Sequence, residues 1–402
     1  MSNIPKLRFP EFTDAWEKCK LGSIAKRVKG NDGDMSLPTL TISAGSGWLS
    51  QKERFSGNIA GTEQKNYTLL KKGQLSYNHG NSKVAKYGAV FVLKTYEKAL
   101  VPRVYHSFEM NKNGCADFIE VLFATKLPDR ELVKKITSGA RTDGLLNISF
   151  EGFMDINIKI PTLPEQQKIG NLFKQLDRLI TLHKRKWDDV ILLKKALLQK
   201  MFPKNGSDFP EIRFPEFTDA WEKCKLGEVA EIYDGTHQTP NYKKSGIMFL
   251  SVENIETMIS DKFISEDDFK REFKTYPTRG DVLMTRIGDI GTVNIVNTNQ
   301  RLAYYVSLAL LKPKLVLSEY LKPLIESELI QKELWKRTLH VAFPKKINKG
   351  EIEEIPIIHP TLPEQQKIGA LFRRLDRLIT LHKRQHEHYQ LLKKALLQQM
   401  FV

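Results

Sequence analysis

The chain has 402 residues, of which 63 are Lys or Arg and 47 are Asp or Glu, so its formal net charge is +16 at pH 7. At about 100–200 residues per domain this length predicts two or three domains with real cores, which excludes fibrous and disordered classes. Three cysteines (Cys19, Cys115, Cys224) cannot form a disulfide framework, which favours a reducing cytoplasm. The apolar run at 303–311 is far shorter than the ~20 residues that span a bilayer, so no membrane association is expected.

The sequence repeats itself. The segment RFPEFTDAWEKCKLG at 8–22 recurs unchanged at 213–227, and PTLPEQQKIG at 161–170 recurs at 360–369. The stretches between these blocks barely resemble each other. The chain is therefore a tandem duplication in which a copied frame surrounds two unlike inserts.

Each insert predicts a mixed α/β domain. Short apolar runs bounded by Gly and Asn are typical of strands, and they occur at 37–43, 88–93, 247–252, 282–285 and 292–296. Helical periodicity appears near 115–126, 129–138 and 318–338. Trp16 and Trp221, in the copied block, are expected to anchor the cores of the two domains.

The residues after each PTLPEQQKIG block predict a long amphipathic helix. Thr162 and Glu165 have the spacing of a capping box, in which the Glu side chain bonds back to the cap residue, and Thr361 and Glu364 repeat it. Apolar residues then recur every three or four positions, as in a coiled coil. The predicted helix-helix seam begins with Ile169, Leu172, Leu176 and Leu179 in the first copy, and with Ile368, Leu371, Leu375 and Leu378 in the second.

The simplest partner for the apolar stripe of each helix is the other copy. Because the first helix leads directly into the second insert, we expect antiparallel pairing with pseudo-twofold symmetry; the alternative is that each helix packs onto its own domain. The predicted fold is α+β, with two mixed α/β domains joined by two long helices that form an antiparallel coiled coil. The predicted divisions are a first domain at 1–161, a first spacer helix at 162–203, a second domain at 204–360 and a second spacer helix at 361–402.

No catalytic motif is recognisable. The sequence lacks a Gly-x-x-x-x-Gly-Lys-Ser/Thr phosphate loop, an Asn/Asp-Pro-Pro-aromatic motif and a Gly-rich dinucleotide loop. His382, His386 and His388 could suggest a metal site, because residues four apart share a helical face. The first helix has Trp187 and Asp189 in place of the last two, so no metal site is expected.

Two loops of the second insert carry groups suited to reading base edges. The segment DGTHQTP at 234–240 gathers Thr236, His237 and Gln238, and the strand-loop-strand at 280–291 places Thr285 and Arg286 near its tip. Arg pairs with guanine and Gln with adenine in the major groove. These five residues are predicted to bind DNA, although each could also be an ordinary turn or surface group.

The first insert has a corresponding run, which follows Gly73 as the other follows Gly280. Its predicted DNA-binding residues are Asn78, His79, Asn81, Ser82 and Lys83. Because these side chains differ from those of the second insert, the two targets should differ. The +16 charge is consistent with a polyanionic partner, and the Lys and Arg residues of the long helices could contact phosphates, a protein partner or only water.

Two unlike inserts, each followed by a copied TLPEQQKI helix, together with DGTH at 234–237 and the strand-loop-strand at 281–291, closely resemble the DNA specificity subunit of type I restriction-modification systems. The resemblance covers the whole chain, although the first insert has KGND at 29–32 where the second has DGTH. It implies that each insert is a target recognition domain that reads one half of a bipartite, asymmetric site in double-stranded DNA. The paired helices would fix the spacing of the two halves.

The resemblance also implies that this chain has no activity of its own and binds no cofactor. Two methyltransferase subunits would bind S-adenosylmethionine, and two restriction/translocase subunits would use ATP with Mg²⁺. The remaining alternatives are a nucleic-acid-binding scaffold without sequence specificity and a divergent DNA-modifying enzyme.

Overall fold

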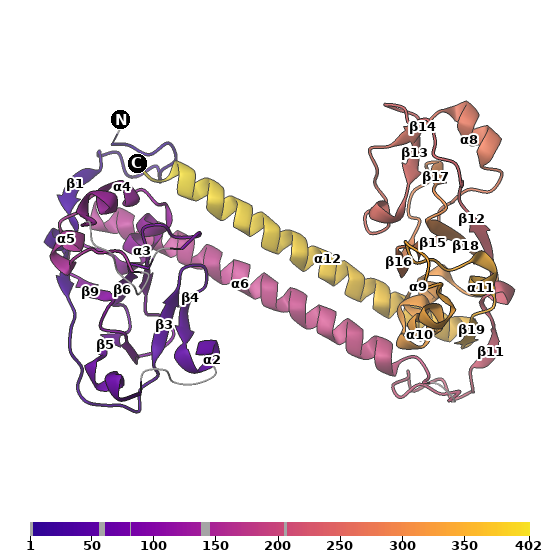
Figure 1. The fold of residues 1–402 in the computed structure, drawn as a ribbon, viewed down its shortest axis with the longest axis horizontal. Coiled ribbons are helices and arrows are strands. Elements are labelled where there is room, and N and C mark those ends of the chain that lie inside the picture. Colours follow the sequence, from indigo (N-terminus) through magenta and orange to yellow (C-terminus); the bar gives the residue numbers. More distant parts are fainter. Residues whose placement is uncertain (1–2, 56–60, 81, 138–144, 205–206) are drawn as a thin grey trace. The chain divides into compact units, whose positions relative to one another are not determined.

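The computed structural model describes residues 3–55, 61–80, 82–137, 145–204 and 207–402. The chain forms two compact units (Figure 1). Unit 1 comprises Met1–His183 with Arg384–Val402, and unit 2 comprises Lys184–Lys383. Each unit therefore contains one of the unlike inserts and one half of each long helix.

Unit 1 is built on a four-stranded antiparallel sheet with the strand order β2-β9-β6-β7. Its strands are β2 (Ala25–Arg27), β9 (His106–Met110), β6 (Leu75–Asn78) and β7 (Ala89–Val92). Two strand pairs flank it, β3 (Leu40–Ser43) with β4 (Gly47–Ser50) and β5 (Thr68–Lys71) with β8 (Lys98–Val101). The longest helix of the insert is α3 (Ala116–Ala124), and the shorter ones include α1 (Leu21–Ile24), α2 (Gln51–Phe55), α4 (Asp129–Leu132) and α5 (Phe150–Met154).

Unit 2 has a sheet of the same topology, in the order β12-β18-β15-β16. Its strands are β12 (Ala230–Asp234), β18 (Leu308–Pro313), β15 (Val282–Ile287) and β16 (Asp289–Ile295). A second sheet joins β14 (Phe263–Ile264), β13 (Ile247–Leu250) and β17 (Leu302–Tyr304), with α8 (Glu266–Glu272) beside it. The helical pattern near 318–338 is two helices, α9 (Ser318–Glu326) and α10 (Glu328–Arg337), because Ser327 is extended at ψ 151°.

The registers make the two central sheets directly comparable. Leu75 pairs with Phe108 in unit 1, and Val282 pairs with Leu311 in unit 2. The hairpin β6–β7 is therefore equivalent to β15–β16, in the alignment that Gly73 and Gly280 indicate. This places His79 and Arg286 at equivalent positions.

The copied block forms the same structure in each unit. Strand β1 (Glu17–Lys20) pairs with β10 (Asn157–Ile160), and β11 (Glu222–Lys225) pairs with β19 (Pro356–His359). Helix α7 (Leu226–Val229) follows β11, and α11 (Lys349–Glu353) precedes β19. Trp16 and Trp221 are buried in the two cores, which confirms them as anchors.

The two long helices are α6 (Leu163–Lys200) and α12 (Leu362–Gln399), and they pair in both units. In unit 1, Asp177 of α6 forms an ion pair with Lys393 of α12, and the rings of His183 and Tyr389 stack 5.5 Å apart. In unit 2, Lys194 of α6 lies 2.7 Å from Asp376 of α12. The numbering rises along one helix as it falls along the other, so the predicted antiparallel pairing is confirmed within each unit.

Each long helix is also part of the domain cores. Phe173 and Phe372, near the helix starts, are buried in the cores of units 1 and 2. At the other ends, Phe401 lies edge-on to Trp16 at 5.8 Å, and Phe202 lies edge-on to Trp221 at 6.1 Å. Both sequence interpretations therefore hold, because the helices pack against each other and against the domains. The predicted seam residues are buried (Ile169, Leu176, Ile368, Leu375) or half-buried (Leu172, Leu179, Leu371, Leu378).

A buried ion pair fixes the start of each helix. Both oxygens of Glu165 accept hydrogen bonds at 2.7 Å from the guanidinium of Arg8, and Glu364 accepts equivalent bonds at 2.8 Å from Arg213. The prediction that Glu165 bonds back to its own helix cap was wrong, because its carboxylate is bound to the copied N-terminal segment instead. Bidentate pairing of this kind fixes direction as well as distance.

The next residues of the copied motif bind the insert. Gln166 accepts a hydrogen bond at 2.9 Å from the amide of Cys115, which caps α3, and Gln365 accepts one at 2.9 Å from Leu317, which caps α9. Gly170 then lets α3 approach, since a Cβ there would lie 2.9 Å from Asp117 Cβ. Gln-Gln-Lys-Ile-Gly is thus a socket for one helix of each insert.

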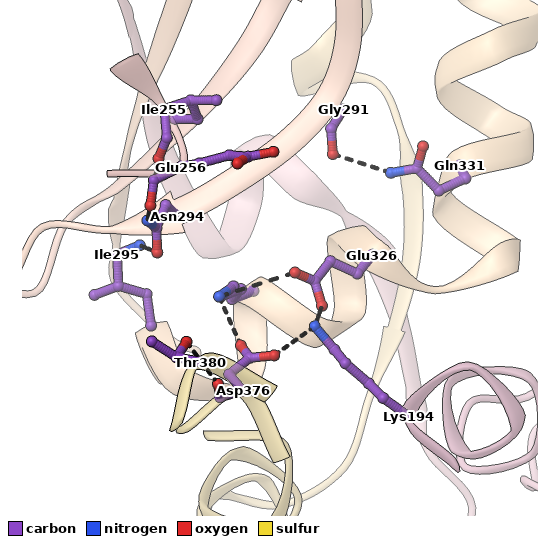
Figure 2. Close-up of polar contacts among 11 residues, drawn as sticks. Lys194, Ile255, Glu256, Gly291, Asn294, Ile295, Glu326, Gln331, Asp376 and Thr380 are labelled. Atoms are coloured by element: carbon purple, nitrogen blue, oxygen red, sulfur yellow. Dashed lines mark hydrogen bonds and ion pairs between the residues drawn. The ribbon is translucent and has the colours of Figure 1, made fainter. Parts of the chain in front are cut away.

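Unit 2 adds a charged network around its socket (Figure 2). Lys194 contacts Glu326 at 2.6 Å and Asp376 at 2.7 Å, and Lys322 contacts the other oxygen of Asp376 at 2.7 Å. Burial opposes ionisation of Asp376, but the two lysines outweigh it and hold its pKa below the ordinary value. The equivalents of Lys322 and Glu326 in α3 are Glu120 and Ala124, so unit 1 cannot form this network.

Glu165→Gln should destabilise unit 1 by about 3–5 kcal/mol, because it leaves the guanidinium of Arg8 buried without a counter-charge. The matched control is Glu11→Gln in the same segment, whose exposed ion pair with Lys168 should be worth less than about 1 kcal/mol. Scanning calorimetry of the full chain measures both, and equal effects would contradict the role assigned to the buried pair.

A circular permutant opened in the 204–207 linker should fold. The amide of Leu7 bonds to Gln399 O at 3.0 Å in unit 1, as the amide of Ile212 bonds to Lys200 O at 2.9 Å across the continuous chain of unit 2. A short linker from Val402 to the N-terminal segment would therefore copy a junction that already exists. Circular dichroism and the unfolding temperature test this, and a permutant recovered only as aggregate would count against it.

Candidate nucleic-acid interface

Arg286 lies at the centre of three segments of unit 2. Its backbone is at the end of β15, two residues before the turn at Gly288, but its side chain points inward and is 5% exposed. The guanidinium forms an ion pair with Asp234, and its Nε donates to Ile347 O at 3.1 Å. Burial lowers the pKa of Arg286, and the Asp234 carboxylate supplies the counter-charge. In this arrangement two of the three guanidinium nitrogens of Arg286 are bonded inside the protein, where they hold neighbouring loops in place.

The DGTH segment is held by its first three residues. Gly235 passes so close to the neighbouring strand that a Cβ would lie 2.5 Å from Tyr304 O. Thr236 donates to Glu272 of α8 at 3.0 Å and is half-buried. His237 and Gln238 follow and are exposed. The first three residues therefore build the loop, and the next two are the ones that it displays.

A third segment, which we call the 339–346 loop, adjoins the hairpin tip. The Leu339 amide bonds to Lys346 O at 2.7 Å and closes the loop, while the Gly288 amide bonds to Lys345 O at 2.8 Å. The loop carries the most exposed apolar side chains among the described residues, Val341 and Phe343. Nothing in the sequence indicated this segment, because AFPKK at 342–346 has no periodic pattern.

A cavity of about 190 Å³ lies between the hairpin tip, the end of α10 and the 339–346 loop. Ile290, Trp335 and His340 are among its lining residues, and the rings of the last two lie 4.7 Å apart. Lys345 reaches the same cavity. The hairpin tip, the end of α10 and the 339–346 loop therefore line one cavity with aromatic rings, the Gln331 amide and the Lys345 ammonium group.

His79 takes the place of Arg286 in unit 1. It is 3% exposed, and its ring nitrogens lie 2.7 Å from Leu146 O and 2.8 Å from Val104 O. Its ring stacks on His106 at 4.8 Å. Burial lowers the pKa of His106 to about 4, so this ring is neutral at pH 7. His79 thus contacts two other segments through backbone carbonyls, where Arg286 contacts two other segments of unit 2 through a carboxylate and one carbonyl.

The other predicted DNA-binding residues fall into three groups. Thr285 is fully buried in β15, and Asn78 is half-buried, with its amide donating to Ile42 O at 3.2 Å. Ser82 and Lys83 are exposed, as are His237 and Gln238. Asn81 lies outside the described residues. His79, Thr285 and Arg286 were expected to face DNA; the structure buries all three side chains, and those of His79 and Arg286 contact other segments of their own unit.

Among the residues that the structure describes, no group of three or more His, Cys, Asp or Glu side chains is arranged to hold a metal ion. The same part of the chain contains no helix that is both long and apolar enough to cross a membrane.

Comparison with known proteins assigns this architecture. The family model described as "Type I restriction modification DNA specificity domain" matches residues 14–191 and 218–388. The chain belongs to this family. The two matches fall on the two halves of the duplication, so each half of the chain is one specificity domain.

Curated relatives of this specificity protein come from Methanocaldococcus jannaschii. The type I restriction enzyme MjaVIII specificity subunit is 24% identical over 304 residues, which cover 71% of this chain and 70% of the relative. The putative type I restriction enzyme MjaX specificity subunit is 22% identical over 321 residues, covering 71% and 68%. Both are named for specificity, the non-catalytic component of a restriction enzyme.

The fold is that of a solved type I restriction-modification S subunit. The crystal structure of the subunit from M. genitalium has a TM-score of 0.59, with 12% sequence identity and 99% coverage of both chains. At this identity the likeness concerns the fold. It agrees with the predicted class of two mixed α/β recognition domains and two long helices.

Arg286→Lys should lower the free energy of unfolding of unit 2 by about 2 kcal/mol, because one ammonium group cannot serve both the Asp234 carboxylate and the Ile347 carbonyl. The control is Arg301→Lys, whose exposed ion pair with Glu266 contributes less than about 1 kcal/mol. Limited proteolysis should show new cleavage in 234–240 and 339–346 for the first variant only. A cleavage pattern shared by both variants would contradict the positioning role.

Proposed function

We propose that this chain is the subunit that selects the DNA sequence in a type I restriction-modification complex, and that each unit reads one half of a bipartite, asymmetric site. One observation carries the proposal: two units with the same frame and sheet topology have different groups at equivalent positions. His79 stands where Arg286 stands, and Lys29-Gly-Asn-Asp stands where Asp234-Gly-Thr-His stands. Two units with the same framework but different exposed side chains suit an asymmetric target. In this proposal His237 and Gln238 face one half of the site, and Ser82 and Lys83 face the other.

We further propose that the paired helices fix the distance between the half-sites. Both ends of each helix are buried in a domain core, as the contacts of Phe173 and Phe401 in unit 1 and of Phe372 and Phe202 in unit 2 indicate. A domain held in this way cannot turn on its helix without opening its core. Half-sites about one DNA turn apart, ~34 Å, would be read from one face of the duplex.

The long helices also offer docking surfaces for partner subunits. Leucines at equivalent positions remain exposed in both units, namely Leu182, Leu391 and Leu392 in unit 1 and Leu381, Leu192 and Leu193 in unit 2. Exposed apolar groups repeated in this way support two identical partners on one chain. We propose that these are two methyltransferase subunits that bind S-adenosylmethionine, accompanied by two restriction/translocase subunits that use ATP and Mg²⁺.

Profiling of methylated adenines tests the main proposal. The chain is expressed with its methyltransferase partner in a host without adenine methylation, and modified positions are read by single-molecule sequencing. We expect one asymmetric motif with two specified halves and an unspecified gap. Replacing His237 and Gln238 by Ala should relax one half only. Methylation without sequence preference would favour the non-specific scaffold, and methylation by this chain alone would favour the enzyme.

Insertion of four residues into both helices tests the spacing role. The insertions go between His183 and Lys184 and between Lys383 and Arg384, where the helices pass from one unit to the other. Each helix becomes about 6 Å longer, so the preferred gap should grow by one or two base pairs at ~3.4 Å each. Insertion into one helix alone should disrupt the pairing. An unchanged gap with both insertions would refute the spacing role.

Leu192→Asp should remove one of the two methyltransferase subunits, and Leu391→Asp the other, because each adds a charge to one apolar surface. The double variant should bind neither. Native mass spectrometry gives the stoichiometry, with Gln199→Asp, an exposed position on the same helix, as the control. Full retention of both partners by the double variant would place the docking surface elsewhere.

A further inference from the structure

We propose that the 339–346 loop of unit 2 is a wedge that inserts Phe343 between stacked base pairs of the bound DNA. The inference rests on the function proposed above and adds a mode of contact to it. Phe343 is apolar and cannot form hydrogen bonds with base edges, so its proposed role is separate from those of His237 and Gln238.

The tip of this loop is apolar and uncovered. Val341 and Phe343 have exposed fractions of 98% and 104%, and Trp335 at the adjoining end of α10 has 67%. Single exposed apolar residues are ordinary, but two neighbours that touch almost nothing on a projecting loop mark a surface that another molecule covers.

The tip is held rigidly. The loop is closed by the bond from the Leu339 amide to Lys346 O, and the Ala342 amide bonds to Leu339 O at 3.3 Å. Its base is joined to the hairpin by the Ile347 amide, which bonds to Arg286 O at 3.0 Å. These bonds hold Phe343 away from the domain, so its exposure is built into the fold and its ordering cost is met before binding.

The charges around the tip select DNA as the occupant. Lys345 and Lys346 are exposed, and neither forms an ion pair with any described residue. The acidic groups nearby are Glu333 and Glu351, which pair with Lys336 and Arg337, and Asp289 at the hairpin tip, which accepts a bond from Thr292. An apolar side chain beside free cations is the combination with which DNA-bending proteins unstack a base step while binding phosphates.

The position of the 339–346 loop beside the Asp234–Gln238 segment also supports DNA as the molecule that covers it. Arg286 links the 339–346 loop, through Ile347 O, to Asp234 at the start of the displayed His237 and Gln238. A duplex read by those two residues therefore passes beside the wedge. Insertion favours a flexible pyrimidine-purine step, so the wedge would select sequence through deformation.

The test uses the full chain with its methyltransferase partner and duplexes that carry the methylation motif, with 2-aminopurine scanned across and beside the second half-site. Unstacking brightens this base. We expect brightening at one step with the native chain, its loss with Phe343→Ala together with roughly 10-fold weaker binding, and partial recovery with Phe343→Leu. The control is Leu315→Ala. Leu315 is 62% exposed and follows the C-terminal end of β18, so this change should alter neither the fluorescence nor the affinity.

A second measurement separates phosphate contact from insertion. Lys345→Gln with Lys346→Gln should reduce the slope of log K against log salt by about 1.8 while leaving the bright step in place. Unchanged binding and fluorescence in Phe343→Ala would overturn the wedge, as would loss of a methyltransferase subunit from that variant in native mass spectrometry, which would make the loop a protein contact. Failure of the native chain to distinguish the motif from a scrambled duplex would instead overturn the proposed function.

Discussion

The structure depends on a buried ion pair that occurs twice. Arg8 and Glu165 in unit 1, and Arg213 and Glu364 in unit 2, join the first copied block to the second across an insert of more than a hundred residues. Such a pair is costly to bury, so its value lies in geometry as much as in stability. Its two parallel bonds fix the direction in which each long helix leaves its domain, and the rest of the frame is built on that direction.

The loops around Arg286 and His79 are also held by a buried polar side chain. Arg286 and His79 occupy equivalent positions of the two central sheets. Each is buried, with Arg286 bonded to the Asp234 carboxylate and Ile347 O and the ring nitrogens of His79 within 2.8 Å of Leu146 O and Val104 O. A buried polar group is stable only when all of its bonds are made, so the segments that supply those bonds are held in place. The position has thus kept a structural task in both units, while the exposed residues around it have diverged.

The sequence predicted the architecture well because the architecture is periodic and repeated. The copied blocks defined the frame, the three-and-four spacing defined the helices, and the alignment of Gly73 with Gly280 identified equivalent hairpins. It failed where side-chain direction decides. Thr285 and Arg286 point to opposite faces of β15, and both are buried because core residues cover this strand on both faces, which the sequence around a turn does not reveal. Glu165 found a partner 157 residues away, and local capping rules cannot anticipate such a contact.

The side chains that each loop exposes were equally hard to predict from the sequence. The first three residues of the Asp234-Gly-Thr-His segment hold the loop in place, and the most exposed apolar side chains of the described residues come from 339–346, a stretch without a periodic pattern. Apolar residues are normally assigned to the core, so only the structure could identify Phe343 as external. The periodic parts of this protein could therefore be derived from sequence, whereas the side-chain directions in the loops required coordinates.

The socket has a consequence for how such proteins change. Gln166 and Gln365 bind their inserts through the main-chain amides of Cys115 and Leu317. Gly170 lies against the first turn of α3, at Asp117. The frame therefore binds the backbone at the start of each of these helices. It also packs an aromatic ring against one side chain of each helix, because Trp16 lies 5.6 Å from Phe118 and Trp221 lies 6.2 Å from Tyr320. A different insert would fit the same frame if it began a helix of this shape and placed an aromatic ring at the third position of that helix, as Phe118 and Tyr320 do.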